Sequence, residues 1–135
     1  MNCRLFLVLI ASVALAPALA AQADPATTDT LRASRASTMK ADLKLLAQRQ
    51  RLFFLRHQTY ANSTSRLTLR PSALGLIRIL SAGRGGWSAT LTASEEPGLA
   101  CGIFVGDAVA PNAAVVADSE PACWVRLSDG SIIQA

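Results

Sequence analysis

The sequence predicts an α+β domain in which one long N-terminal amphipathic helix packs on a three- or four-stranded antiparallel sheet. Two observations predict this fold class. No proline or glycine interrupts residues 31–58, and strong helix formers dominate there. Short β-like runs separated by glycine-containing turns occupy most of the chain after residue 75. A helix with one apolar stripe and a sheet with one apolar face can bury these surfaces against each other.

The helix is expected over residues 31–57, with Asp29 or Thr30 as its N-cap. Apolar side chains recur at spacings of three and four, while arginine and lysine fill most of the other positions. This periodicity predicts a broad apolar stripe that faces the sheet, which Leu45, Leu52 and Leu55 would widen. The core face of the stripe is expected to contain Met39, Leu43, Leu46, Phe53 and Tyr60.

Three β-like runs follow a connector in which a short helical turn is expected near residues 72–74. The second run, GWSATLTAS, alternates apolar or small residues with hydroxyl side chains, as a half-buried strand does. The segment Gly83–Gly86 fits a hairpin loop, so the runs are expected to form an antiparallel meander. The chain closes on CWVRLSDGSIIQA, where Asp129-Gly130 is a hairpin-type turn.

Residues 1–23 have the order of a secretory signal peptide: one cation, an apolar run and small residues in the A-x-A pattern. Cleavage is expected after Ala20 or Ala23, and the alternative is a retained membrane anchor. Residues 24–30 are expected to be a flexible leader and residues 31–135 the domain. The mature protein is therefore predicted to be periplasmic or secreted, with no stable membrane span after cleavage.

Export also bears on the cysteines. Cys3 would leave with the signal peptide, so Cys101 and Cys123 remain as an even pair in an oxidising compartment. A disulfide between them is the default expectation. A bond that closes a loop of about 20 residues stabilises a small domain by on the order of 3 kcal/mol.

The residues that carry most catalytic and metal chemistry are scarce. His57 is the one histidine, at the helix end, and the two remaining cysteines lack C-x-x-C spacing. The adjacent Glu95 and Glu96 are interpreted as a solvated turn and not as an acid/base pair. We therefore expect no catalytic residue, no cofactor site and no metal site, and the protein is not expected to be an enzyme.

Charge is distributed unevenly along the chain, whose formal net charge is +4. Residues 24–86 contain eleven lysines and arginines against three acids, whereas residues 87–135 contain one arginine and six acids. Nucleic-acid binding is one interpretation of the basic half. A solvated helix face with electrostatic attraction to a partner is favoured, because interleaved exposed aromatics are missing and the chain is predicted to be exported. No nucleic-acid partner is expected.

Several motifs occur in a familiar order. They are the helical segment MKADLKLLAQRQRLFFLRHQTYA, the turn LRPSALG, the strand GWSATLTA and the run from CGIFVG through PN to EPACW. In this order the sequence resembles the globular domain of type IV pilins and type II secretion pseudopilins over residues 37–124. The pilin-type N-terminal segment is missing, and an ordinary export signal stands in its place.

The resemblance implies a non-enzymatic structural or interaction module whose partner is a component of a pilus or of a secretion system. It also implies that the disulfide-bounded loop is an exposed contact surface. The candidate contact residues there are Asp107, Pro111, Asn112, Asp118 and Glu120. The alternative function is a small periplasmic ligand-binding domain.

Overall fold

The computed structural model describes residues 24–135, so the predicted signal peptide and its cleavage site lie outside the described residues. The elements are α1 (Pro25–His57), a 3-10 helix η1 (Thr64–Leu67) and five strands. The strands are β1 (Gly75–Ala82), β2 (Gly86–Ala93), β3 (Leu99–Gly106), β4 (Ala122–Arg126) and β5 (Ile132–Gln134).

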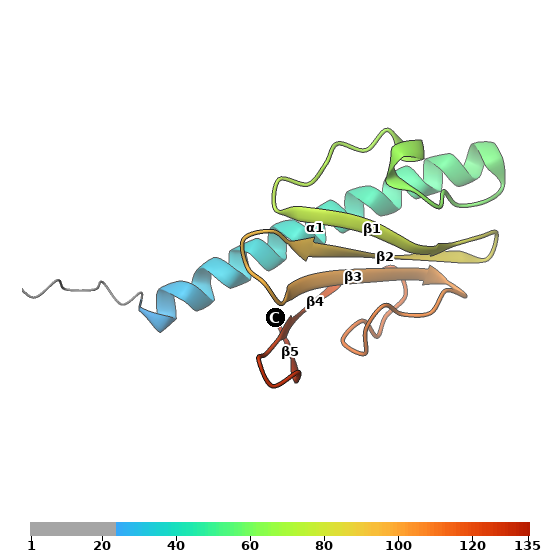
Figure 1. Cartoon of the computed structure of the whole chain (residues 1–135). Coiled ribbons are helices and arrows are strands. Elements are labelled where there is room, and N and C mark those ends of the chain that lie inside the picture. Colours follow the sequence, from blue (N-terminus) through green and yellow to red (C-terminus); the bar gives the residue numbers. More distant parts are fainter. Residues whose placement is uncertain (1–23) are drawn as a thin grey trace, which may run out of the picture.

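The predicted fold class is confirmed: one long helix packs on an antiparallel sheet (Figure 1). The strands lie in sequence order, β1-β2-β3-β4-β5, and each pairs antiparallel with its neighbour. The sheet has five strands and not three or four, because the turn at Asp129-Gly130 lets the last residues return along β4 as β5. The expected hairpin loop joins β1 to β2.

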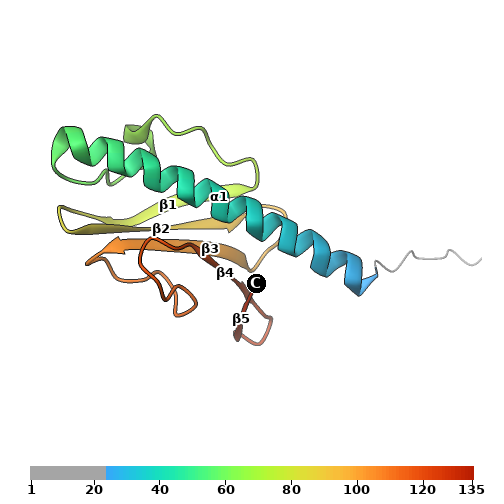
Figure 2. The same ribbon diagram turned by 180° about the vertical axis from the view of Figure 1, so that it is seen from behind.

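The helix begins six residues earlier than the sequence pattern indicated, which corrects the flexible leader expected at residues 24–30. Asp24 is the N-cap, and its carboxylate accepts a hydrogen bond of 3.1 Å from the Ala26 N–H. Pro25 follows in the first turn, where its fixed φ suits a helix and its missing N–H costs nothing. The helix is therefore about 50 Å long, and its N-terminal turns project beyond the sheet (Figure 2).

The helix ends where expected, at His57, because Gln58 adopts the left-handed conformation and its N–H bonds to the Phe54 carbonyl at 2.8 Å. The connector then forms one 3-10 turn at residues 64–67. Residues 72–74, where a helical turn was expected, only bend before β1.

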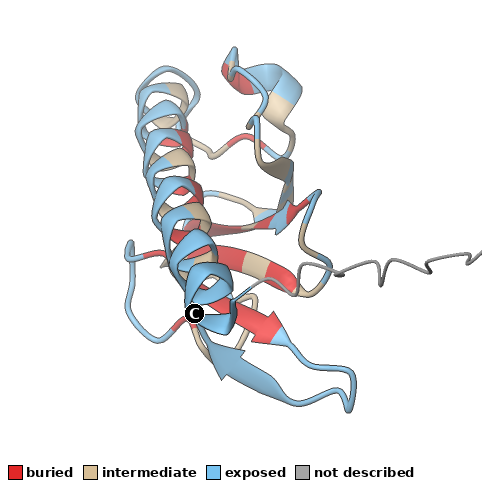
Figure 3. Ribbon diagram, turned by 90° about the vertical axis from the view of Figure 1, so that its left-hand side faces the viewer, coloured by how far each residue is buried: buried red, intermediate tan, exposed pale blue. Residues whose placement is uncertain are grey.

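The core lies between one narrow face of α1 and one face of the sheet (Figure 3). Met39, Leu43 and Leu46 are fully buried, as predicted, against the inward side chains of β2 and β3. Phe53 and Tyr60 are only half-buried at the edge of this core, and Tyr60 lies beyond the helix end.

The prediction that Leu45, Leu52 and Leu55 widen the buried apolar stripe is wrong. Leu45, Leu52 and Leu55 are 41%, 51% and 65% exposed, because the helix contacts the sheet along a single narrow arc. Gln50, by contrast, is fully buried on the core face. Its amide donates to the Ala61 carbonyl and accepts from the Ala61 N–H, both at 2.8 Å. This polar side chain fixes the path of the chain after the helix ends.

Candidate functional site

The predicted disulfide is confirmed, and it joins Cys101 of β3 to Cys123 of β4. The two residues lie opposite each other in the register of these strands, and both are fully buried. The loop of residues 107–121 leaves the sheet at the end of β3 and returns to it at β4. The bond therefore ties the strands at the base of this loop, so the loop is anchored by the sheet and by the disulfide together.

Three of the predicted contact residues help to shape this loop. Asn112 accepts a hydrogen bond of 2.9 Å from the Ala114 N–H, and Asp118 accepts one of 3.2 Å from the Gly106 N–H. Pro111 packs where the missing side chain of Gly102 leaves room: a Cβ there would lie 2.6 Å from its Cγ. Pro111 and Asn112 are consequently half-buried, whereas Asp118 remains exposed.

Asp107 and Glu120 are also exposed. Glu120 forms an ion pair of 3.6 Å with Lys44 of α1, which links the loop to the helix. Two apolar side chains of the loop are also exposed: Val109 is 84% exposed and Val116 is 82% exposed. Neither valine was among the contact residues expected from the sequence, although both are apolar residues near acids in a segment without strand periodicity.

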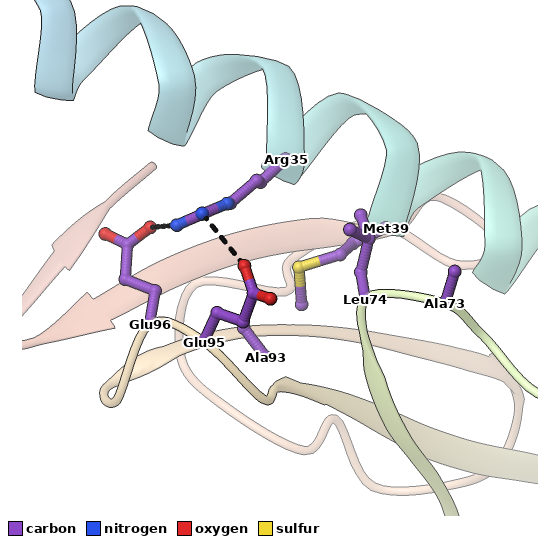
Figure 4. A pocket seen from close by; sticks show the side chains of 7 residues that line it. All are labelled: Arg35, Met39, Ala73, Leu74, Ala93, Glu95 and Glu96. Carbon is purple, nitrogen blue, oxygen red and sulfur yellow. Dashed lines mark hydrogen bonds and ion pairs between the residues drawn. The ribbon is translucent and has the colours of Figure 1, made fainter.

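The turn between β2 and β3 carries an ion cluster, which corrects the interpretation of this turn as solvated for Glu96 but not for Glu95. Arg35 reaches from α1 to both glutamates, with nitrogen–oxygen distances of 3.3 Å (Figure 4). Arg32 also pairs with Glu96. Glu95 stays 83% exposed, but only 17% of the Glu96 side chain is accessible, because it lies under both guanidinium groups.

These pairs change the ionisation of Glu96. The hydrogen bond from Arg32 is the main cause that holds the pKa of the Glu96 carboxyl below its ordinary value, and Arg35 adds to it. The same hydrogen bond raises the pKa of the Arg32 guanidinium. Both groups therefore stay charged at neutral pH.

A hollow of about 60 Å³ lies between Arg35 and the two glutamates, and buried Met39 forms part of its wall. This hollow is too small for most ligands.

A cationic cleft lies at the other end of the helix. It encloses about 170 Å³ between the last turns of α1 and the segment of η1. Arg49, Arg56 and His57 line it from the helix, and Arg66 lines it from η1. The Phe53 ring lies among them, with the His57 ring centre at 4.1 Å and the Arg66 guanidinium carbon at 4.9 Å from its centre. His57 is exposed there.

An open aromatic groove of about 490 Å³ lies on the other side of the helix, toward the disulfide-bounded loop. The Phe54 and Tyr60 rings form part of its wall, with centres 4.7 Å apart, and Trp87 lies 6.5 Å from Tyr60. Arg51 is the charged residue in its lining.

Across the part of the chain that the structure describes, no three His, Cys, Asp or Glu side chains gather in a way that could hold a metal ion. No helix within residues 24–135 combines the length and the hydropathy that a membrane crossing requires. No family model, curated protein or solved structure matches the chain.

Proposed function

We propose that this protein is a non-enzymatic, exported, pilin-like interaction module that associates with a component of a type IV pilus or a type II secretion system. The observation that carries the proposal is the disulfide-anchored loop. It presents Val109 and Val116 to solvent beside the exposed acids Asp107, Asp118 and Glu120.

The arrangement of the loop supports this function. Its backbone is held by the hydrogen bonds to Asn112 and Asp118 and by the pairing of β3 with β4. A surface that is already ordered loses less conformational entropy when it binds. Two large apolar side chains that stay exposed on such a frame offer contact area, and the neighbouring acids favour a partner with basic residues.

The fold supports the same proposal. A long helix on an antiparallel meander, with a disulfide-bounded loop between β3 and β4, is what the resemblance to pilins and pseudopilins implies. The helix projects beyond the sheet at its N-terminal end and exposes Leu31, which is 55% accessible.

Affinity capture from the envelope of the source organism tests the proposal. The mature, disulfide-bonded chain serves as bait, and mass spectrometry identifies the captured proteins. A pilus or secretion-system component is expected among them and should be lost from the V109D/V116D double variant. The matched control is L76D, because Leu76 is 64% exposed on β1, outside the loop. Equal capture by all three baits, or no such component with any of them, would contradict the proposal.

The second candidate function, a small periplasmic ligand-binding domain, is favoured by the cationic cleft. Its cations come from two separate elements and line one hollow. A site of that kind suits a small anion better than it suits the surface of a partner protein.

A further inference from the structure

The cleft between the end of α1 and η1 carries more positive charge than the fold requires. Cations near a helix C-terminus offset the macrodipole, which is equivalent to about half a negative charge. Three guanidinium groups, from Arg49, Arg56 and Arg66, line this cleft, and arginine stays charged at any relevant pH. The dipole therefore leaves most of this charge uncompensated.

Within the described residues, no acidic side chain forms an ion pair with these arginines. Among residues 24–135, the ion pairs join Arg32, Arg35 and Lys44 to their acids, and none involves an arginine of the cleft. Like charges that converge in one hollow repel one another, which lowers the stability of the folded state. A bound anion would remove this cost.

The position of each arginine suits such a ligand. Arg66 lies over the Phe53 ring at 4.9 Å, and a cation–π contact of this kind holds a guanidinium in place with about 0.5–1 kcal/mol. Arg49 and Arg56 lie two helical turns apart and so project from the same side of α1. Guanidinium groups pair with the oxygens of phosphate through two parallel hydrogen bonds.

A strained residue lies in the same cleft. Thr68 directly follows η1 with φ 51° and ψ 40°, a left-handed conformation that β-branched residues rarely adopt. Such strain costs on the order of 1–3 kcal/mol and is concentrated at functional sites. Thr68 lines the hollow together with Leu67 and Arg66.

We propose that this cleft is a binding site for a tetrahedral oxyanion, with a phosphate group as its ligand. The volume of about 170 Å³ is below the usual range of roughly 300–1,000 Å³ for drug-sized ligands, so it suits one small charged group. In the proposed site, Arg49, Arg56 and Arg66 bind the oxygens. The ligand is a free phosphate ester or the phosphate of a lipid headgroup.

This inference gives the ligand class of the second candidate function and does not depend on the interaction module. The disulfide-bounded loop joins β3 to β4, whereas the cleft is lined by the last turns of α1 and by the segment of η1. In Figure 1, η1 lies beside β1 at the other edge of the sheet. Failure of phosphate binding would therefore leave the capture experiment unaffected.

The test is calorimetric titration of the oxidised mature chain with inorganic phosphate, and with chloride at matched ionic strength. Saturable binding of phosphate but not of chloride is expected. Arg56→Gln and Arg66→Gln should each weaken it by about tenfold. Arg56→Lys, which keeps the charge but loses the two-pronged geometry, should give an intermediate affinity. Arg51→Gln is the control, because it removes the same charge from the same helix but lines the aromatic groove.

Equal heats with phosphate and chloride would overturn the proposal. So would an equal loss of affinity in Arg51→Gln and Arg56→Gln, since net charge alone would then explain binding. Flotation with phosphatidylglycerol vesicles identifies the source of the phosphate. Flotation that Arg56→Gln abolishes points to a lipid headgroup, and calorimetric binding without flotation points to a soluble phosphate ester; either result supports the site.

Discussion

At the scale of single residues, polar side chains decide how α1 is joined to the rest of the chain. Glu96 forms ion pairs with Arg32 and Arg35 in the N-terminal half of α1. Near the C-terminal end of α1, the Gln50 side chain forms hydrogen bonds with the backbone of Ala61. Neither role is visible in hydropathy periodicity, because each depends on a partner that lies outside the helix. Both sets of contacts are expected to contribute to the free energy of unfolding.

Glu96→Gln should destabilise the protein at neutral pH by about 0.5–1 kcal/mol, as expected for a partly accessible ion pair. The pKa of Glu96 is lower in the folded state than its unfolded value of about 4.3. The carboxylate therefore stabilises the fold above that value, and its contribution is lost as the pH falls through the folded pKa.

Urea denaturation of both proteins at neutral pH and near pH 3 measures this dependence. The difference in unfolding free energy should shrink in acid. Glu95→Gln is the control and should have a smaller effect, because Glu95 is 83% exposed. A difference of the same size at both pH values would refute the role assigned to Glu96.

Gln50→Leu should cost about 1–3 kcal/mol for each Ala61 group left without a partner, because both backbone groups are buried. Gln48→Leu provides the comparison: Gln48 is exposed, so a change within about 0.5 kcal/mol is expected. The midpoints of urea denaturation measure both effects, provided that the dependence of the unfolding free energy on urea concentration is the same for the proteins compared. Similar midpoints for the two variants would mean that the Gln50–Ala61 hydrogen bonds contribute little.

At the scale of elements, two features govern the fold: the narrow buried face of α1 and the bond between β3 and β4. Met39, Leu43 and Leu46 form the face that the sheet covers. The disulfide joins strands that already pair, so it reinforces the sheet at the base of the loop.

Reduction of Cys101–Cys123 should destabilise the domain by about 3 kcal/mol, because the open chain gains conformational entropy when it unfolds. Thermal unfolding with and without reductant measures the effect, and the reduced protein should melt at a lower temperature. The C101A/C123A variant should behave alike with and without reductant. An unchanged melting temperature of the wild type under reductant, after thiol titration confirms reduction, would contradict this prediction.

Leu43→Ala should cost about 2–5 kcal/mol, because Leu43 is fully buried in the core. Leu45→Ala changes the same residue type two positions along the helix, but Leu45 is 41% exposed, so the expected loss is about 0.5 kcal/mol. Phe53→Ala should fall between the two, since Phe53 is half-buried. A larger loss for Leu45 than for Leu43 would mean that another face of α1 is buried.

At the scale of the whole molecule, periodicity and turn chemistry were sufficient to predict the layer architecture. The 3-4 spacing around Leu43 and the alternation along residues 86–93 each reflect local geometry, which the neighbouring sequence determines. The hairpin turns follow from glycine in the same way. The expected pairing of Cys101 with Cys123 followed from the predicted export and from the even cysteine count that remains after it.

The burial of individual side chains and the contacts between distant segments could not be predicted from local sequence patterns. Leu45, Leu52 and Leu55 satisfy a helical stripe as well as the core residues do, and only the width of the contact with the sheet excludes them. The cationic cleft depends on η1 folding back beside the helix end, which brings Arg66 close to Phe53. The exposure of Val116 likewise depends on how Asn112 and Asp118 shape the loop.

Site-specific photocrosslinking in the source organism tests the central claim most directly. A photoreactive amino acid at position 116, which is 82% exposed in the native chain, probes the loop, and the same group at position 76 probes the outer surface of β1. The interaction module predicts a crosslink from position 116, and none from position 76, to a pilus or secretion-system component identified by mass spectrometry. The same crosslinks from both positions, or none to such a component from position 116, would contradict it.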